Sequence, residues 1–300
     1  MDHTSKLSGV FAPVVTPFKN DELIIDDLRY NLRKLNESNL TGYLALGSNG
    51  EFKSLTTREQ ILVLEVFAQE KGDKTVMVGT GCESTKQTID TSLIAADMGF
   101  EYVSILTPNY FAKLMSGPVL KDYYTRIADE LPIPVLLYNA PGFTGGVQIP
   151  PAIMCELSHH PNIVGMKDSS PTGPARYLSN LDRTAEFHIL AGSINFFYQS
   201  LHLGSPGGVI SLSNVLPDLC CDLYRLFREG KFEEARDLHF RLGRLSIAIS
   251  GSYGVAGVKA AMNMTGFRGG EPRHPLTPLS AKGIESVRNS ILSEGFSLPE

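Results

Sequence analysis

The sequence predicts an α/β fold, a (β/α)₈ TIM barrel followed by a C-terminal α-helical extension. Two observations lead to this prediction. Short apolar runs alternate with helical patterns along the chain, which indicates right-handed crossovers and a parallel sheet. Eight such runs occur before the strand pattern stops, and eight strand–helix units fit a closed barrel better than an open doubly wound sheet.

The expected strands are short runs rich in aliphatic and β-branched residues, each ended by polar or turn-forming residues. In chain order they cover residues 9–17, 42–46, 75–79, 102–106, 135–139, 163–166, 188–191 and 208–212. A doubly wound nucleotide-binding sheet would usually show a G-x-G-x-x-G loop after its first strand. Here the first strand ends in Thr16-Pro17, which favours the barrel.

Helical spacing of apolar residues is found between the strands. Asp26 is expected to cap the first helix, and Thr57 to begin the second. Further helices are expected at residues 120–131 and 151–159, and after the last strand at 219–229, 232–250 and 253–264. We therefore divide the chain into a catalytic barrel domain, residues 1–225, and a C-terminal helical extension, residues 226–300.

Composition limits the partners that the protein can bind. The 300 residues are 42% hydrophobic and 20% charged, which is enough for one large core. The net charge of −5 and the lack of a long Lys/Arg cluster argue against nucleic acid. No apolar run approaches the roughly 20 residues that span a bilayer, and the N-terminus resembles neither a signal peptide nor a presequence. We therefore expect a cytoplasmic protein with no nucleic-acid or membrane partner.

The four cysteines, Cys82, Cys155, Cys220 and Cys221, show no CxxC pattern and no Cys/His ligand spacing. Neither disulfides nor structural zinc are expected. Cys220 and Cys221 lie in a helical pattern, and we interpret both as small packing residues.

One lysine is unusual because it ends an apolar run. Residues 163–166 carry no polar side chain, Lys167 follows them, and Asp168 and Ser169 then end the strand. Desolvation penalises the charged form of a lysine, and the neutral amine is a nucleophile that forms Schiff bases with carbonyl compounds. The alternative is a lysine that reaches from a strand end into solvent, and this stretch alone favours that alternative. The residues at the other strand ends favour the nucleophilic lysine instead.

The active site of a barrel lies at the C-terminal ends of its strands, so the residues expected there belong together. One lysine, two tyrosines and several hydroxyls converge, without a His, Asp or Glu cluster that could hold a metal. This set suits amine catalysis, in which a lysine forms an imine and a phenol or hydroxyl moves protons. No metal and no separate cofactor are expected. The residues are Ser48, Asn49, Gly50, Thr80, Gly81, Tyr110, Tyr138, Lys167, Gly192, Ser193, Ile210 and Ser211.

Several of these positions also have an ordinary structural interpretation. A single tyrosine at a strand end, such as Tyr138, usually serves packing with its hydroxyl in contact with water. Glu51 alone would be a first-turn charge favoured by the helix dipole. Asp168 should point away from Lys167 on a pleated strand, which makes it a structural residue rather than a general base.

Three motifs in chain order resemble the dihydrodipicolinate synthase/N-acetylneuraminate lyase superfamily. They are Gly47-Ser48-Asn49-Gly50-Glu51, Tyr138-Asn139-x-Pro141-x-x-Thr144-Gly145 and Gly165-Met166-Lys167-Asp168. The resemblance extends from about residue 9 to the C-terminal helices. Within the superfamily, the first motif with residues 81–85 and 160–169 is most similar to 4-hydroxy-2-oxoglutarate aldolases, and 2-keto-3-deoxy sugar-acid aldolases share this character.

The resemblance implies four catalytic residues. Lys167 would form a Schiff base with C2 of pyruvate, and Tyr138 would be the acid/base around the imine and the aldol hydroxyl. Ser48 stands where the synthases commonly have threonine and keeps a relay hydroxyl. Tyr110 matches a relay tyrosine that is donated across a dimer interface, so a homotetramer built as a dimer of dimers is implied.

The resemblance also implies substrate-binding residues. Asn49 and Gly50, with Ser48 and the neighbouring amides, would bind the pyruvate carboxylate. Gly192 and Ile210 match wall positions that contact the imine through backbone groups, and Ser193 adjoins Gly192. The small-molecule partner would be a 2-oxo acid.

Phe143 is a departure from the family pattern. In the synthases this position carries an arginine that holds the second substrate's carboxylate, and an apolar ring cannot replace a bidentate cation. Phe143 therefore argues against synthase activity. Because the matching arginine binds substrate in the synthases, we include Phe143 among the expected substrate-binding residues.

The expected function is a metal-independent class I aldolase that cleaves 4-hydroxy-2-oxoglutarate to pyruvate and glyoxylate. One alternative is a 2-keto-3-deoxy sugar-acid aldolase, which releases pyruvate and glyceraldehyde. Others are 4-hydroxy-tetrahydrodipicolinate synthase and a barrel without catalysis that binds a small molecule.

Overall fold

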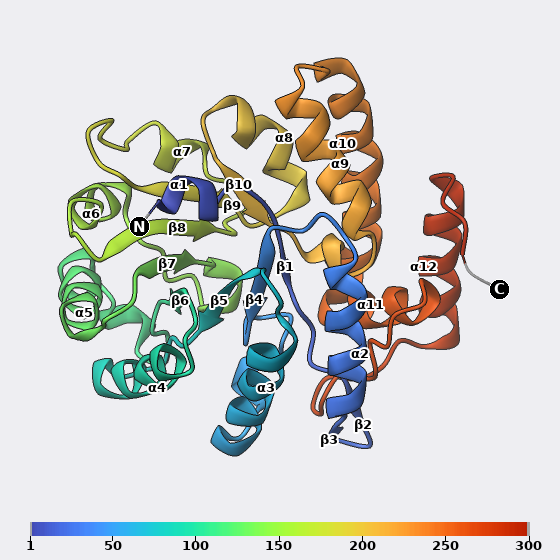
Figure 1. The fold of residues 1–300 in the computed structure, drawn as a ribbon, viewed down its shortest axis with the longest axis horizontal. Coiled ribbons are helices and arrows are strands. Elements are labelled where there is room, and N and C mark those ends of the chain that lie inside the picture. The colour runs from blue at the N-terminus through green and yellow to red at the C-terminus, as the bar shows by residue number, and fades with distance from the viewer. Residues whose placement is uncertain (1, 299–300) are drawn as a thin grey trace.

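The computed structural model describes residues 2–298 of the chain. Its centre is a closed barrel of eight parallel strands, with helices arranged around it (Figure 1). The strands are β1 (Gly9–Pro13), β4 (Gly42–Ala45), β5 (Thr75–Gly79), β6 (Tyr102–Leu106), β7 (Val135–Asn139), β8 (Ile163–Asp168), β9 (His188–Ala191) and β10 (Gly207–Val209). Each strand pairs with the next in chain order, and β10 pairs with β1 to close the barrel. The predicted (β/α)₈ barrel is confirmed.

The first and last strands are shorter than predicted. After β1, Thr16-Pro17 lead into a small antiparallel hairpin of β2 (Phe18–Lys19) and β3 (Glu22–Leu23). These two-residue strands are too short to show an alternating pattern. After β10, the chain turns into the 3₁₀ helix η4 (Ser211–Asn214), because the Ser213 backbone N–H and hydroxyl both donate to the Ile210 carbonyl.

The barrel interior is filled by one layer of large apolar side chains, which makes it a packed core rather than a channel. Each of the eight strands contributes one buried residue to this cluster, and Leu7 closes it at the N-terminal end. The strand residues are Phe11, Leu44, Met77, Tyr102, Leu136, Val164, Leu190 and Val209. Substrate can therefore reach only the ends of the strands.

The surrounding helices pack their apolar faces against the outside of the barrel. They are α2 (Ile25–Asn36), α3 (Thr57–Glu70), α4 (Thr85–Asp97), α5 (Gly117–Glu130), α6 (Pro151–Leu157), α7 (Ala175–Leu178) and α8 (Ile194–His202), with the 3₁₀ turns η1 (Phe52–Ser54), η2 (Ala112–Leu114) and η3 (Pro141–Phe143). The short polar helix α1 (His3–Lys6) has no buried residue and is not part of this set. Thr57 begins α3 as predicted, with Thr56 as its cap. The predicted cap Asp26 is wrong, because α2 begins at Ile25 and Ile24 occupies the capping position. Asp26 instead lies in the first turn, where the dipole favours a carboxylate.

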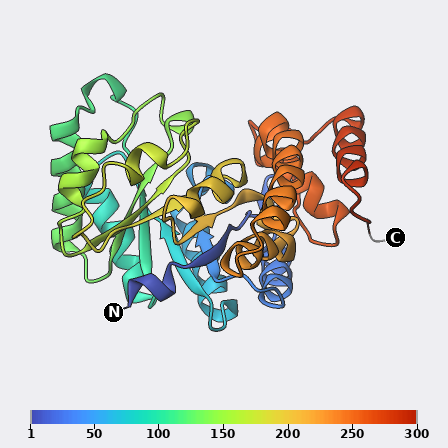
Figure 2. The same ribbon diagram turned by 90° about the horizontal axis from the view of Figure 1, so that it is seen from above.

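The C-terminal helices lie on one side of the barrel rather than around it (Figure 2). They are α10 (Phe232–Ser246), the π-helical turn η5 (Ile247–Gly251), α11 (Ser252–Met264) and α12 (Ala281–Ser293), whereas α9 (Pro217–Arg228) contacts β1 and α8 and completes the ring of helices around the barrel. The first three predicted helices are present, whereas α12 was not predicted. The proposed division between residues 225 and 226 falls inside α9, and it stays a prediction.

The four cysteines are free, and Cys220 and Cys221 are buried in α9 as packing residues. Burial raises the pKa of the Cys220 thiol well above its ordinary value and that of Cys221 to about 12. Both thiols are therefore poor nucleophiles. Along residues 2–298, none of the helices combines the length and the hydropathy needed to cross a bilayer.

Candidate active site

Lys167 and Tyr138 lie side by side at the C-terminal ends of β8 and β7, where the sheet register pairs them directly. The Lys167 Nζ lies 4.2 Å from the centroid of the Tyr138 ring. Each residue is only 5% exposed. A buried amine beside a phenol is therefore present at the end of the barrel where catalytic groups are found.

An irregularity in β8 directs Lys167 into the barrel. The register between β7 and β8 shifts so that Val135 pairs with Ile163 but Leu136 pairs with Gly165. Such a bulge inserts a residue and reverses which face the following side chains occupy. Val164 lies in the interior cluster, so strict alternation would have placed Lys167 on the outer face.

Gly165 lets the neighbouring strand approach this bulge. A Cβ at Gly165 would meet the His188 carbonyl oxygen of β9 at 2.4 Å, closer than such atoms approach. The glycine of the Gly165-Met166-Lys167 motif is therefore explained by close strand packing next to the lysine.

Ser48 connects the loop after β4 to Tyr138. The Ser48 Oγ lies 3.4 Å from the Tyr138 phenol oxygen, at the long end of a hydrogen bond. Burial alone would raise the pKa of the Tyr138 phenol. The positive charge of Lys167 and hydrogen bonds with Ser48 and Ser169 oppose burial and bring this pKa below its ordinary value. The phenol is thus able to give up and regain a proton.

Asn49 and Gly50 continue the same loop toward the last strand. The Asn49 side-chain amide donates to the Ser211 hydroxyl at 2.6 Å, and the Thr16 hydroxyl donates to the Gly50 carbonyl at 2.8 Å. Ser48 and Asn49 are half-buried, whereas Gly50 is buried. The loop thereby reaches Tyr138 through Ser48, and its backbone N–H groups form a set that can receive a carboxylate.

Asp168 is turned toward structural partners, as the pleat predicts. Its carboxylate accepts hydrogen bonds from the Asn139 amide at 2.7 Å and from the Ser170 hydroxyl at 2.8 Å. The Asn139 oxygen in turn accepts from the Ile149 backbone N–H at 3.0 Å. Asp168 and Asn139 are fully buried, so both side chains fix the loops after β7 and β8 and are not open to substrate.

Gly192 and Ser193 follow β9, next to the end of β8. The Gly192 N–H donates to the Asp168 carbonyl at 2.7 Å, and a Cβ at Gly192 would meet that oxygen at 2.5 Å. Ser193 caps α8, since its hydroxyl oxygen accepts from the Asn195 N–H. Ile210 is buried at the end of β10, and its carbonyl is occupied by Ser213. Glycine is thus required at position 192, where the chain after β9 approaches the end of β8 that carries Lys167.

Two predicted residues lie on the surface of the single chain. Tyr110 is 78% exposed, and its ring and backbone contact Phe111 and Glu83 rather than Tyr138. Phe143 is 63% exposed in η3, directly after the strand that carries Tyr138. The structure therefore brings Ser48, Tyr138 and Lys167 together, and it leaves Tyr110 and Phe143 at the rim.

A buried ion pair behind the Ser48 loop was not predicted. Glu51, interpreted above as an ordinary first-turn charge, is buried and pairs with Lys259 of α11. Glu51 has a left-handed backbone and precedes a 3₁₀ turn, and its carboxylate is buried rather than exposed at a helix start, which corrects that interpretation. A lysine within the apolar residues 255–261 was the one signal in the sequence, and it gave no indication of a partner. Within residues 2–298, no three His, Cys, Asp or Glu side chains gather to form a metal site.

Known proteins match the chain along nearly all of its length. The sequence model of the Dihydrodipicolinate synthetase family matches residues 6–294. The chain is 34% identical over 288 residues to the 4-hydroxy-tetrahydrodipicolinate synthase of Methanospirillum hungatei, covering 94% of this chain and 98% of that protein. It is 32% identical over 299 residues to a protein of Emericella nidulans named probable 4-hydroxy-2-oxoglutarate aldolase, mitochondrial, covering 97% and 95%.

Solved structures of dihydrodipicolinate synthases are also similar to this chain over nearly its whole length. The dihydrodipicolinate synthase of Thermotoga maritima has a TM-score of 0.88 and 29% identity, covering 97% of this chain and 99% of that chain. A monomeric dihydrodipicolinate synthase variant has a TM-score of 0.89 and 28% identity, covering 99% and 100%. The barrel and these relatives define a carbon–carbon lyase of the class I aldolase type. The chain belongs to the Dihydrodipicolinate synthetase family.

Proposed function

We propose that this protein cleaves 4-hydroxy-2-oxoglutarate to pyruvate and glyoxylate through an imine on Lys167. The observation that carries the proposal is the contact of the Lys167 amine with the Tyr138 ring at 4.2 Å, with Ser48 within 3.4 Å of the same phenol. Amine catalysis needs a nucleophilic lysine and a group that moves protons next to it. Lys167 and Tyr138 supply both.

The reaction follows from these groups. The Lys167 amine adds to the C2 carbonyl, water leaves, and a protonated imine forms. Tyr138, with Ser48 as relay, removes the proton of the C4 hydroxyl. The C3–C4 bond then breaks, its electrons form an enamine on the lysine, and glyoxylate leaves. Protonation at C3 and hydrolysis of the imine release pyruvate and restore Lys167, so no cofactor beyond the lysine is required.

The loop of residues 48–50 is the proposed site for the carboxylate next to C2. Ser48 contacts Tyr138, and the loop behind it is held in place because Asn49 donates to Ser211 and Gly50 accepts from Thr16. An anion bound there would place the neighbouring carbonyl carbon toward Lys167. Gly192 and Ile210 form the walls of the site.

The second carboxylate of 4-hydroxy-2-oxoglutarate needs a separate partner. Phe143 offers no charge, and Asn139 is buried with both amide atoms engaged. Ser193 remains, because it is half-buried at the N-terminus of α8, where backbone N–H groups favour an anion. Phe143 itself favours a neutral substrate tail, so a 2-keto-3-deoxy sugar acid is the second candidate.

A lyase assay over three reactions tests this function. We expect pyruvate release from 4-hydroxy-2-oxoglutarate or from a 2-keto-3-deoxy sugar acid, with the first preferred. Condensation of pyruvate with aspartate semialdehyde should be slower by roughly 30-fold or more, since loss of a charged partner costs about 2–5 kcal/mol. Efficient formation of the dihydrodipicolinate product would contradict the assignment, although the names of several relatives point that way. Activity should survive EDTA and desalting.

We further propose a homotetramer built as a dimer of dimers, in which Tyr110 completes the site of a neighbouring chain. The exposed Tyr110–Phe111 pair, with ring centroids 4.9 Å apart, supports an aromatic contact between chains. Mixing inactive Tyr110→Phe and Lys167→Ala chains should restore part of the activity. An active monomer in light scattering would contradict the proposal.

A further inference from the structure

The loop that carries Ser48, Asn49 and Gly50 has an unfavourable backbone at both ends. Leu46 has a φ of 53° and Glu51 a φ of 52°, left-handed values that side-chain-bearing residues rarely adopt. Residues in such regions persist only where the surrounding structure holds them. The contacts that hold this loop therefore decide how it is presented to the substrate.

Glu51 anchors the loop on the C-terminal extension. Its carboxylate pairs with the Lys259 ammonium of α11 and accepts the Arg273 backbone N–H at 2.9 Å. The Lys259 side chain is 1% and the Glu51 side chain 2% exposed. Because a buried charge without a partner is strongly unfavourable, each group fixes the position of the other.

Lys259 also fixes the strand end that supports the loop. Its Nζ donates to the Thr16 carbonyl at 2.7 Å and to the Glu271 carbonyl at 2.8 Å, and it lies 4.5 Å from the centroid of the Phe18 ring. The Thr16 hydroxyl donates to the Gly50 carbonyl at 2.8 Å. One buried lysine thus reaches the loop directly through Glu51 and again through Thr16.

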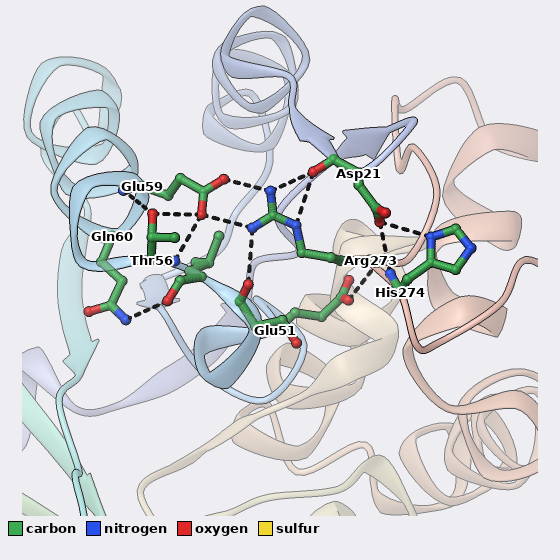
Figure 3. A network of polar contacts seen from close by, with 9 residues as sticks. Asp21, Glu51, Thr56, Glu59, Gln60, Arg273 and His274 are labelled. Carbon is green, nitrogen blue, oxygen red and sulfur yellow. Dashed lines mark hydrogen bonds and ion pairs between the residues drawn. The ribbon is translucent and has the colours of Figure 1, made fainter.

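Arg273 makes a second set of contacts next to Glu51, and Figure 3 shows its side chain between Glu59 and Asp21. The Arg273 guanidinium donates to Glu59 at the start of α3, to the Ser54 carbonyl and to the Asp21 carbonyl. Its centre lies 4.5 Å from the centroid of the Phe18 ring. The segment after α11 is thereby attached to the β2–β3 hairpin and to the start of α3, which follows the loop.

We infer that the Lys259–Glu51 pair is a positioning device, through which the C-terminal extension holds residues 46–51 in the conformation that binds the substrate carboxylate. The inference rests on the proposed function, since it assigns the loop to carboxylate binding. Neither residue touches the reacting atoms. Losing the pair should therefore weaken binding of the 2-oxo acid and leave the chemical step at Lys167 intact.

The test uses pyruvate and borohydride on the full chain, with the pyruvate concentration at half-maximal trapping as the readout. Lys259→Met alone leaves a buried carboxylate without its cation and destabilises the fold, so the main variant is Glu51→Gln/Lys259→Met, which removes both charges. Lys74→Met is the matched control. Lys74 also donates to two backbone carbonyls, of Ser38 and Leu40, but at the opposite end of the barrel.

We expect the double variant to need at least about tenfold more pyruvate for half-maximal trapping, with the trapping rate at saturation within about twofold of the unmodified chain. Lys74→Met should leave the half-saturation unchanged. Thr16→Val, which removes only the hydroxyl bound to Gly50, should give a smaller shift in the same direction. Amide hydrogen exchange of residues 46–51 should be faster in the double variant and unchanged in Lys74→Met.

An unchanged half-saturation and unchanged exchange in the double variant would overturn this inference alone, because the unmodified chain would still trap pyruvate. A double variant that loses rate at saturation as much as affinity would also overturn it, since the pair would then affect the chemistry. Failure of the unmodified chain to trap pyruvate would overturn the proposed function together with the inference.

Discussion

The protein buries two lysines, Lys259 and Lys167, whose surroundings differ. Lys259, at the junction with the extension, is matched by the Glu51 carboxylate and two backbone carbonyls. Lys167, at the mouth of the barrel, contacts the ring of Tyr138. The two residues are buried to a similar extent, since Lys259 is 0% exposed and Lys167 is 5% exposed. The groups that contact each lysine therefore determine whether it is structural or catalytic.

The comparison shows what makes a buried lysine a nucleophile rather than a structural cation. A lysine held by an anion and two carbonyls is fixed in position, whereas one next to a phenol has a partner that exchanges protons with it. Variants at the mouth should therefore change the rate with little effect on stability. Variants at the junction should change stability and binding.

The largest effect is expected from Tyr138→Phe, which leaves the ring and removes the hydroxyl. Loss of a general acid/base lowers kcat/KM by about 10²- to 10⁴-fold, while the thermal midpoint should change little. Because Tyr138 is the base that removes the C4 hydroxyl proton and its pKa lies below the ordinary value of 10.0, the activity of the unmodified enzyme should rise with pH as the phenol loses its proton, and the variant should lack this rise.

Tyr124→Phe is the matched control for that experiment. Its hydroxyl is fully buried and donates to the Ile105 carbonyl at 3.1 Å outside the site. This variant should lose stability and keep its rate. A Tyr138→Phe enzyme within tenfold of the unmodified activity would contradict the comparison.

An intermediate effect is expected from Phe143→Arg at the rim. A guanidinium at this exposed position can bind a second carboxylate through two hydrogen bonds. The preference for dicarboxylate over neutral-tailed substrates, measured as a ratio of kcat/KM values, should rise by about tenfold or more, since each 1.4 kcal/mol corresponds to tenfold. Phe143→Gln, which is polar but uncharged, should leave the ratio nearly unchanged. An unchanged ratio in the arginine variant would place the second carboxylate elsewhere.

The smallest effect concerns stability at the junction. Burial lowers the pKa of Lys259 from its ordinary value of 10.5 to about 8, although Glu51 opposes the shift. Between these two pH values the unfolded chain binds more protons than the folded chain at this residue, so its contribution makes the free energy of unfolding rise with pH. The slope is at most about 1.4 kcal/mol per pH unit.

Denaturant unfolding from about pH 8 to 10.5 measures this slope. The Glu51→Gln/Lys259→Met variant should lack the rise, and Lys74→Met should retain it. A double variant with the full slope would show that another group is responsible.

The strands and the main catalytic candidates could be predicted from sequence because their signals are local. Apolar runs mark the strands, and Lys167 ends one of them. The bulge at Gly165 could not be predicted, since it depends on how β8 aligns with β7 and β9. The sequence therefore indicated which lysine lies at a strand end, but not how its side chain enters the barrel.

The junction was missed because its partners are distant in sequence. Nothing near Glu51 indicates Lys259 or the Arg273 backbone, which lie beyond the last strand. Helix α12 was missed for a local reason. It buries only Gly283, Val287 and Ile291, a narrow stripe in a segment where glycine and serines lower helix propensity.

The most direct test of the account is where pyruvate becomes attached. Pyruvate and borohydride, followed by peptide mapping, should place one reduced pyruvyl group on Lys167 and none on Lys259, and Lys167→Ala should take up none. Label on Lys259, or full labelling of Lys167→Ala, would contradict the assignment of the nucleophile.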